Sequence, residues 1–302
     1  MMESLSIARF LTAEALEWMH IPGWWTRWQR HQNQGKEQGY YPSSHLYARL
    51  RFLVEQGWIY RIKRAAQYGI TRFVPEPDLY GLLEEGALIV AGYQRRPIDT
   101  VGYDRKRTRS LFTLNHSGDI GTFYAALRAR VERREGLHIA DWYSEHLTAK
   151  HYDRISVRRQ SARGDMETVI LPVQPDATFV LEHAGGSERF FVEVDRGTRP
   201  LTTWVEKIQA YHAYTGSPEL KARYGVDRFI LLATTPTEAQ QHAIMQATAS
   251  VLRKPSARYL FALHPDIHPT TIATAWRKLA SMTASSNSIR PTITTEAHTL
   301  IQ

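Results

Sequence analysis

The chain has 302 residues, of which 43% are hydrophobic and 23% are charged, which is ordinary for a folded protein, and the length suggests two domains. There is no cysteine, which excludes disulfides, cysteine-ligated zinc and thiol catalysis. The formal net charge of +8 favours a polyanionic partner such as DNA or RNA.

The N-terminal part of the chain predicts two helices. Residues 5–20 carry apolar side chains at helical spacing, with Thr12 as a candidate N-cap. Residues 21–41 are expected to form an insertion or a long connection, either irregular or partly helical. A second helix is predicted to begin near Ser43 or Ser44 and to end at Gly57. The apolar stripe expected along this helix consists of Leu46, Leu50, Leu53 and Val54.

A hairpin is predicted after the second helix. Residues 58–62 and 70–74 read as two strands joined by a turn at 66–69. Pro75 and Pro77 are expected to end this hairpin, and a short helix is expected over 79–85.

Two helices, a glycine stop and a basic hairpin follow one another in the order of a winged helix-turn-helix. In that fold the second helix enters the major groove and the hairpin touches adjacent phosphates. Residues 1–91 are therefore expected to bind duplex DNA, and a small helical domain that binds protein is the alternative. The side chains expected to contact DNA are Arg49, Arg51, Arg61, Lys63, Arg64 and Arg72.

The rest of the chain predicts a linker, a second domain and a tail. Residues 92–110 are polar and include a basic run from Arg105 to Arg109, which indicates a linker. From 111 to 282, strands interleaved with helices predict an α/β domain, and the Ser/Thr-rich residues 283–302 predict a loose tail. Helices are expected over 117–135, 202–215, 236–253 and 270–282, and strands over 138–143, 168–174, 177–182, 189–195, 227–233 and 258–263.

The densest set of chemically useful side chains is Asp176, Glu193, Asp195 and Lys207. Because side chains alternate along a strand, Glu193 and Asp195 share one face, and Asp176 opens the preceding strand. If the two strands pair as a hairpin, Asp176 lies near Glu193 or Asp195. Facing carboxylates at strand ends suit a hard cation such as Mg²⁺, which can orient water and stabilise the charge of phosphodiester cleavage.

Lys207 belongs to the helix after this strand, on the same face as Tyr211 and Tyr214. Lysine is seldom buried unpaired, so pairing with Glu193 or Asp195 would explain its position. The structural alternative is an Asp176 that caps a turn, a Glu193–Lys207 ion pair without catalytic role, and core tyrosines.

These residues carry a resemblance to a known family. Pro175-Asp176, the run Glu193-x-Asp195-Arg196-Gly197-Thr198, and Lys207 followed by Tyr211 resemble the replication-relaxation family of plasmid and mobile-element proteins. Leu114-Asn115-His116 and Trp142-x-x-Glu145 also fit, so the resemblance covers roughly residues 40–265. It implies an N-terminal winged helix-turn-helix followed by an α/β domain, a mixed-sheet domain like that of PD-(D/E)xK restriction endonucleases. The whole chain would then be of the α+β class.

The resemblance also implies roles for individual residues. Asp176 and Glu193 would be the carboxylates that hold Mg²⁺ or Mn²⁺, with Glu145 and Tyr211 as auxiliary residues. The sequence departs from the family pattern where Asp195 stands in place of the motif's lysine. Lys207 is the candidate replacement, and a Lys207 that did not reach the site would leave the domain inactive.

Three functions follow as hypotheses. The first is a metal-dependent endonuclease or nickase acting on double-stranded DNA in plasmid or mobile-element replication, transfer or defence. The second is a catalytically inactive DNA-binding accessory factor, and the third is a winged-helix transcription regulator whose second domain senses a ligand. Other replication, transfer or defence proteins and a second copy in a homodimer are further candidate partners. The sequence shows no signal peptide and no apolar run of membrane length, so a cytoplasmic protein without a membrane partner is expected.

Overall fold

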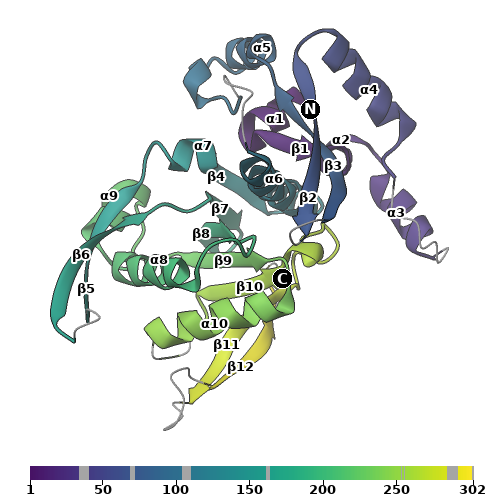
Figure 1. Cartoon of the computed structure of the whole chain (residues 1–302). Helices are drawn as coiled ribbons and strands as arrows, with labels where there is room; N and C mark the ends of the chain where they lie inside the picture. Colours follow the sequence, from purple (N-terminus) through teal and green to yellow (C-terminus); the bar gives the residue numbers. More distant parts are fainter. Residues whose placement is uncertain are drawn as a thin grey trace. The chain divides into compact units, whose positions relative to one another are not determined.

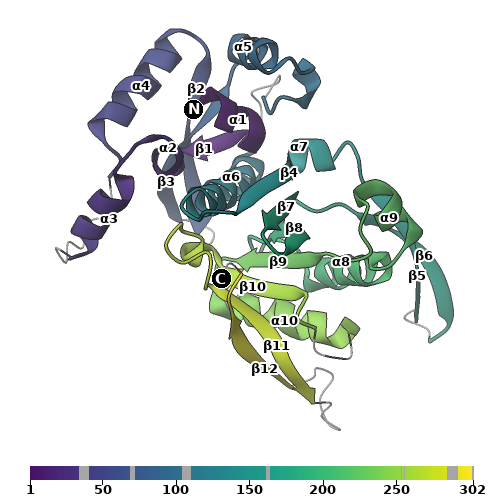
Figure 2. The same ribbon diagram turned by 180° about the vertical axis from the view of Figure 1, so that it is seen from behind.

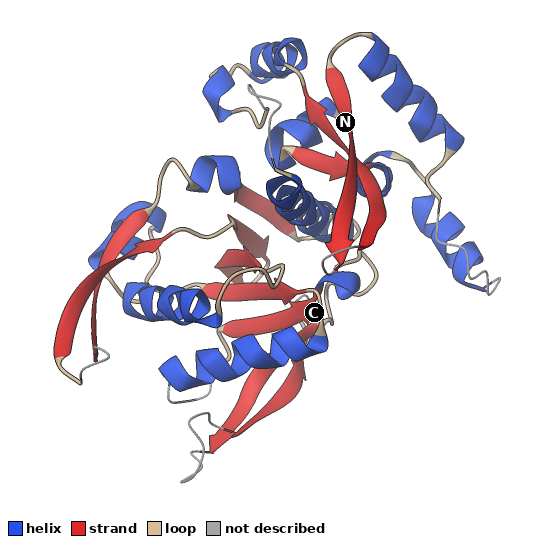
Figure 3. Cartoon of the chain, viewed as in Figure 1, coloured by secondary structure: helices blue, strands red, loops and turns tan. Residues whose placement is uncertain are grey.

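The computed structural model describes residues 1–33, 41–68, 72–103, 110–160, 164–252, 254, 256–283 and 292–300. Helices and mixed sheets alternate along it, so the chain is of the α+β class, as the sequence predicts (Figure 3). It divides into two compact units, Met1–Arg133 and Arg134–Gln302 (Figure 1). The basic run from Arg105 to Arg109 lies outside the described residues.

Helices and a small antiparallel sheet make up the first unit. The sheet has the order β1-β3-β2. The elements are α1 (Met2–Ala8), β1 (Phe10–Thr12), α2 (Ala13–His20), α3 (Trp24–Asn33), α4 (Ser44–Glu55), β2 (Ile59–Tyr68), β3 (Arg72–Leu82), α5 (Glu84–Gln94), a 3₁₀ turn (Ile98–Thr100) and α6 (Leu111–Val131).

Local signals predict two helix caps in this unit correctly, those of α2 and α4. The Thr12 hydroxyl accepts a hydrogen bond from the Ala15 amide at 3.1 Å, and the Ser43 hydroxyl accepts one from the Leu46 amide at 3.3 Å. The expected single helix over 5–20 is wrong, however, because Arg9 at φ 71° ends α1 and the chain passes through β1 before α2 begins.

The predicted end of the hairpin is also wrong. Strand β3 continues past Pro75 and Pro77 to Leu82, so residues 79–82 are strand and the next helix begins only at Glu84. The pairing of β2 with β3 shifts register between Ile62 and Arg64, across from the segment of β3 that holds Pro77. A proline cannot donate to the ladder, and a register shift absorbs that loss without ending the strand.

Helix α6 belongs to the first unit, although the sequence places residues 111–131 in the second domain. Leu114 packs with Phe10 and Leu79 in a buried cluster. Gly121 passes so close to β1 that a Cβ there would lie 1.9 Å from the Phe10 carbonyl oxygen. The compact units therefore divide after Arg133 and not within the expected linker at 92–110.

A seven-stranded mixed sheet of order β12-β11-β10-β9-β8-β7-β4 forms the centre of the second unit (Figure 2). Strands β8, β9 and β10 run parallel, and the other neighbours are antiparallel. The elements are β4 (His138–Ser144), α7 (Glu145–Thr148), β5 (Asp153–Gln160), β6 (Met166–Val173), β7 (Ala177–His183), β8 (Gly186–Val194), α8 (Leu201–Tyr214), α9 (Pro218–Tyr224), β9 (Ile230–Thr235), α10 (Glu238–Leu252), β10 (Tyr259–Leu263), a 3₁₀ turn (His264–Asp266), β11 (Trp276–Thr283) and β12 (Thr292–His298).

The C-terminal end of this unit differs from the prediction. Residues 276–283 form strand β11 in place of the expected helix over 270–282. Residues 292–298 form β12, which pairs with β11, in place of part of the expected loose tail. The strand is favoured by tertiary packing, because Trp276 and Leu279 become buried once β11 extends the sheet next to β10.

Helices α8 and α10 pack on one face of the sheet. Their side chains share a buried cluster with Phe191, Leu231 and Phe261 from three parallel strands. The indole of Trp204 on α8 donates to the Thr248 hydroxyl on α10 at 3.0 Å, which joins the two helices. This packing fixes the face of α8 that looks toward β8, and with it the position of Lys207.

Candidate active site

The hairpin of β7 and β8 brings Asp176 and Glu193 to the same end of the sheet. Ala177 lies across from Val192, so Asp176, one residue earlier, stands level with Glu193. The amide of Asp176 donates to the Val192 carbonyl at 3.0 Å, and one carboxylate oxygen of Asp176 accepts from the Val194 amide at 2.8 Å. These two bonds fix the backbone and side chain of Asp176 against β8.

Glu193 is buried, with 2% of its surface exposed, and helix α8 supplies its partners. The Lys207 ammonium donates to one carboxylate oxygen, and the Tyr211 hydroxyl donates to the other. The predicted pairing of Lys207 with Glu193 is therefore confirmed. The spacing of four residues on α8 places both donors over the strand.

Burial raises the pKa of Glu193 to about 7, against the opposing effect of Lys207. Burial by itself lowers the pKa of Lys207, but the charges of Glu193 and Asp176 outweigh it and raise that pKa. The pKa of Tyr211 is also raised, by burial and then by Glu193, so its hydroxyl remains a donor. At neutral pH the cluster thus holds an ammonium group beside a carboxyl group that titrates near neutrality.

Asp195 makes different contacts from those expected. It follows the last residue of β8, where its carboxylate accepts from the Gly197 amide at 2.8 Å and from the Gln240 side chain at 3.2 Å. Gly197 has φ +76°, which suits the tight turn that Asp195 closes. The bond from Gly197 therefore stabilises the turn before α8, and the bond from Gln240 joins this turn to α10.

Glu145 begins α7 directly after β4. Ser144 lies across from Ala177, so Glu145 is level with Asp176 on the neighbouring strand. Continued by one residue past β4 and β7, the register thus puts Glu145 and Asp176 level with Glu193 at one end of three adjacent strands. Within the described parts of the chain, no group of three or more histidine, aspartate and glutamate side chains is arranged to hold a metal ion.

The two carboxylates fit a hard cation by their chemistry. Mg²⁺ takes oxygen ligands and usually keeps several waters, so one or two carboxylates are enough in many sites. Asp176 and Glu193 provide such oxygens at one end of the sheet.

Sequence reasoning did not find strand β5, whose first residue anchors the end of α8. The Asp153 carboxylate accepts from the Tyr214 hydroxyl and from the Arg223 guanidinium. The sequence carries a signal for it, because the apolar Ile155 and Val157 alternate with the polar Arg154, Ser156 and Arg158 as in a half-buried strand.

The expected DNA-contacting residues lie on exposed parts of the first unit. Arg49 and Arg51 are exposed on α4, and Lys63 is exposed on β2. Arg61, also on β2, pairs with Asp78 on β3 and remains 54% exposed. The side chains of Arg64 and Arg72 lie outside the described residues.

The stripe predicted on α4 is partly confirmed. Leu46 and Leu50 are buried and Leu53 is half-buried, whereas Val54 is 38% exposed. Only a narrow side of the helix is needed for packing, and the remaining surface faces solvent.

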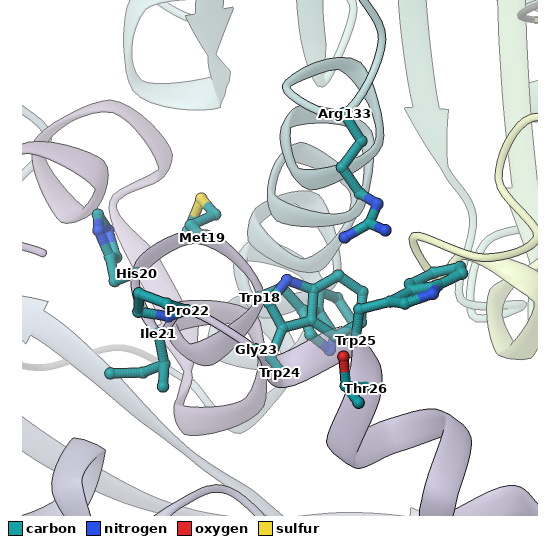
Figure 4. A pocket seen from close by; sticks show the side chains of 10 residues that line it. All are labelled: Trp18, Met19, His20, Ile21, Pro22, Gly23, Trp24, Trp25, Thr26 and Arg133. Atoms are coloured by element: carbon teal, nitrogen blue, oxygen red, sulfur yellow. The ribbon is translucent and has the colours of Figure 1, made fainter.

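A hollow of about 460 Å³ lies elsewhere in the first unit, between the end of α2 and the start of α3 (Figure 4). Its walls include Trp18, Trp24 and Trp25, and the guanidinium of Arg133 lies 4.4 Å from the Trp25 ring centroid. None of its lining residues is acidic, so it shares no chemistry with the cluster around Glu193.

No helix in the described part of the chain combines the length and apolar character that a membrane crossing requires. No curated protein and no solved structure is significantly similar to the chain. The family model described as replication-relaxation matches residues 5–228, which is more than half of the sequence. The chain therefore belongs to the replication-relaxation family, whose description points to a role in DNA replication or relaxation.

Proposed function

We propose that this protein is a metal-dependent DNA endonuclease or nickase that serves plasmid or mobile-element replication, transfer or defence. The observation that carries the proposal is the buried Glu193, which is bonded to Lys207 and Tyr211 and stands level with Asp176. An acid at the start of the first strand of a hairpin, an acid in the second strand and a lysine beside them are the parts of a PD-(D/E)xK site. Here the lysine comes from the following helix.

Asp176 and Glu193 are the proposed ligands for Mg²⁺ or Mn²⁺, and Glu145 is an auxiliary acid at the same level of the sheet. Such an ion polarises a phosphate and lowers the pKa of a bound water. Glu193 must be ionised to act as a ligand, so its pKa of about 7 limits metal binding at lower pH.

Lys207 contributes positive charge in this proposal. Its raised pKa keeps the ammonium charged at neutral pH, and Glu193 fixes its position. A fixed cation aimed at a developing phosphorane charge is worth about 3 kcal/mol, or roughly 100-fold in rate.

The first unit supplies the DNA-binding part of the proposal. Helix α4 exposes Arg49 and Arg51, and it is followed by the β2–β3 hairpin with Lys63 exposed. This order and the sheet β1-β3-β2 support a winged helix whose second helix enters the major groove. Double-stranded DNA is the expected partner.

Binding is tested by titrating a duplex with the full chain at several salt concentrations. Replacing Arg61, Lys63 and Arg64 by alanine should weaken binding and flatten the salt dependence, because each phosphate contact releases a counterion. Unchanged affinity and slope would remove the hairpin from the proposed interface.

Cleavage is tested on supercoiled plasmid with Mg²⁺ and with Mn²⁺. Wild type should nick or cut, whereas Glu193→Gln and Lys207→Ala should not, although both should retain DNA affinity. Glu182→Gln is the matched control, because Glu182 is an exposed carboxylate on β7. A wild type no more active than Glu193→Gln would end the nuclease proposal.

One observation favours the second candidate, a catalytically inactive DNA-binding accessory factor. Both carboxylate oxygens of Glu193 already accept hydrogen bonds, as in a structural ion pair. Calorimetry with Mg²⁺ or Mn²⁺ separates the candidates. Equal heats from wild type and Asp176→Asn would contradict the metal site and favour the accessory factor.

A further inference from the structure

Strands β5 and β6 form a ribbon of their own, separate from the seven-stranded sheet. They pair antiparallel from Asp153–Val173 to Gln160–Met166 with no shift in register. Figure 1 shows the ribbon extending away from the sheet beside α8 and α9. A two-stranded hairpin is marginally stable by itself, so this one depends on its packing.

One face of the ribbon is held against α8. Ile155 and Val157 are buried in the cluster that includes Trp204 and Ile208. The acidic side chains of the two strands are also used internally. Glu167 accepts from Arg159 at 2.9 Å, and Asp153 binds Tyr214 and Arg223.

The other face is exposed along its whole length and carries no acidic side chain. On β5 it presents two arginines, and on β6 it presents apolar and hydroxyl side chains, with Ile170 65% and Met166 57% exposed. The eight outward residues are Arg154, Ser156, Arg158 and Gln160 on β5 and Met166, Thr168, Ile170 and Pro172 on β6.

The two arginines are available for a partner. Arg154 makes one long hydrogen bond, at 3.4 Å, to the Tyr152 hydroxyl. Arg158 is exposed, and no acidic side chain in the described part of the chain pairs with it. Arg154 also lies 5.9 Å from the centroid of the Tyr152 ring, a contact that leaves its charge in place. The outward face therefore carries two positive charges that no acidic side chain in the described part of the chain neutralises.

We propose that the β5–β6 ribbon binds duplex DNA through this outward face, within the groove and on its phosphates. This inference rests on the proposed function, and it assigns a second DNA contact to the unit that carries the acidic cluster. A two-stranded ribbon fits the major groove of B-DNA, which is about 12 Å wide. Each of its strands has 8 residues, which extend about 26 Å.

The side-chain types match that partner. Arginine binds phosphates and the O6 and N7 edge of guanine, and apolar side chains contact the thymine methyl. An acidic protein surface would suit the two arginines equally well. DNA is the better match to the whole ribbon, because the ribbon has the width of the groove, exposes Ile170 and Met166, and belongs to a chain of net charge +8.

The ribbon is also close to the acidic cluster along the chain. Only Gln174 and Pro175 separate the end of β6 from Asp176, whose backbone is fixed against β8. DNA on the ribbon would therefore be held by a segment that leads directly into the proposed site.

The first test measures binding of the full chain to a short blunt duplex in chelator, so that cleavage plays no part. If both arginines contact phosphates, Arg154→Ala/Arg158→Ala should lower the salt slope by about 1.8 and weaken binding roughly 60-fold at 0.1 M salt. The control is Arg228→Ala/Arg277→Ala, which removes two exposed arginines outside the ribbon from the same unit. The proposal would be overturned if the Arg154→Ala/Arg158→Ala variant kept the salt slope of wild type. It would also be overturned if the control variant lost as much affinity as the ribbon variant.

The second test uses the absence of native cysteine. A photo-cross-linker on Ser156→Cys should attach to the duplex, and the same label on Ser250→Cys, exposed on α10, should not. A Ser156→Cys label that yields no DNA adduct sinks the proposal. The cross-linking is also done in chelator. Because neither test then involves metal, their failure leaves the nuclease proposal standing, and failure of the plasmid assay leaves the ribbon proposal standing.

Discussion

Glu193 and its two donors form the residue-scale feature on which the site depends. The carboxyl group is buried, and its folded-state pKa of about 7 exceeds its ordinary value of 4.5. Its contribution to stability is therefore complete below about pH 4.5 and is lost as the pH rises through about 7. The donors offset part of that loss, because both favour the charged carboxylate.

Removing the Tyr211 hydroxyl should raise the pKa of Glu193 further. The hydrogen bond from Tyr211 favours the ionised form, and a phenylalanine leaves one buried oxygen without that donor. An NMR titration of the glutamate carboxyl carbons in Tyr211→Phe checks this. Tyr214→Phe is the matched control, because it removes a hydroxyl of the same helix that binds Asp153. A Glu193 pKa that moves equally in both variants would contradict a specific role for Tyr211.

Lys207→Met should destabilise the fold by roughly 3–5 kcal/mol at pH 8, because it leaves a buried carboxylate without its counter-charge. The double variant Lys207→Met/Glu193→Gln should recover most of that loss, since no charge then remains. Urea unfolding of the single and double variants measures the coupling. Additive losses would show that Lys207 and Glu193 do not act as a pair.

Helix α5 offers an element-scale test of how closely the first unit is packed. Gly86 lies in its first turn, where a Cβ would be 2.1 Å from the Trp58 carbonyl oxygen, whereas Gly92 has nothing within 4 Å. Gly86→Ala should therefore destabilise the protein, because the backbone at Trp58 or in α5 must shift to make room for the methyl group. Gly92→Ala should stabilise it by about 0.5–1 kcal/mol, since alanine loses less backbone entropy in a helix. Thermal unfolding measures both, and equal effects would contradict the close approach.

At the same scale, sequence signals predicted elements whose causes are local. The start of α4 follows from Ser43, whose hydroxyl caps the helix through a bond to the Leu46 amide, three residues away, that does not depend on distant segments. The continuation of β3 past two prolines has no such local cause, because Leu79, Tyr80 and Gly81 pair with both β1 and β2. Burial of those residues between two neighbours outweighs the local preference for a turn.

At the scale of the whole molecule, the compact units predict where the chain can be divided. A fragment of residues 1–133 keeps α6, including Leu114 in the cluster with Phe10 and Leu79, and should unfold cooperatively. A fragment that ends at residue 110 lacks α6 and should melt at a lower temperature or without a transition. Circular dichroism during heating compares them. Equal cooperativity would favour the shorter domain expected from the sequence.

The sequence by itself determined the family resemblance, the alternation that puts Glu193 opposite α8, and the helix face shared by Lys207 and Tyr211. Each depends on spacing within one element, which strand and helix geometry dictate. Only the tertiary structure decided that Asp176 stands level with Glu193, that Asp195 accepts a hydrogen bond from Gln240 of α10, and that β11 and β12 extend the sheet. Those outcomes depend on pairing between distant segments, where the burial of residues such as Trp276 outweighs local propensity.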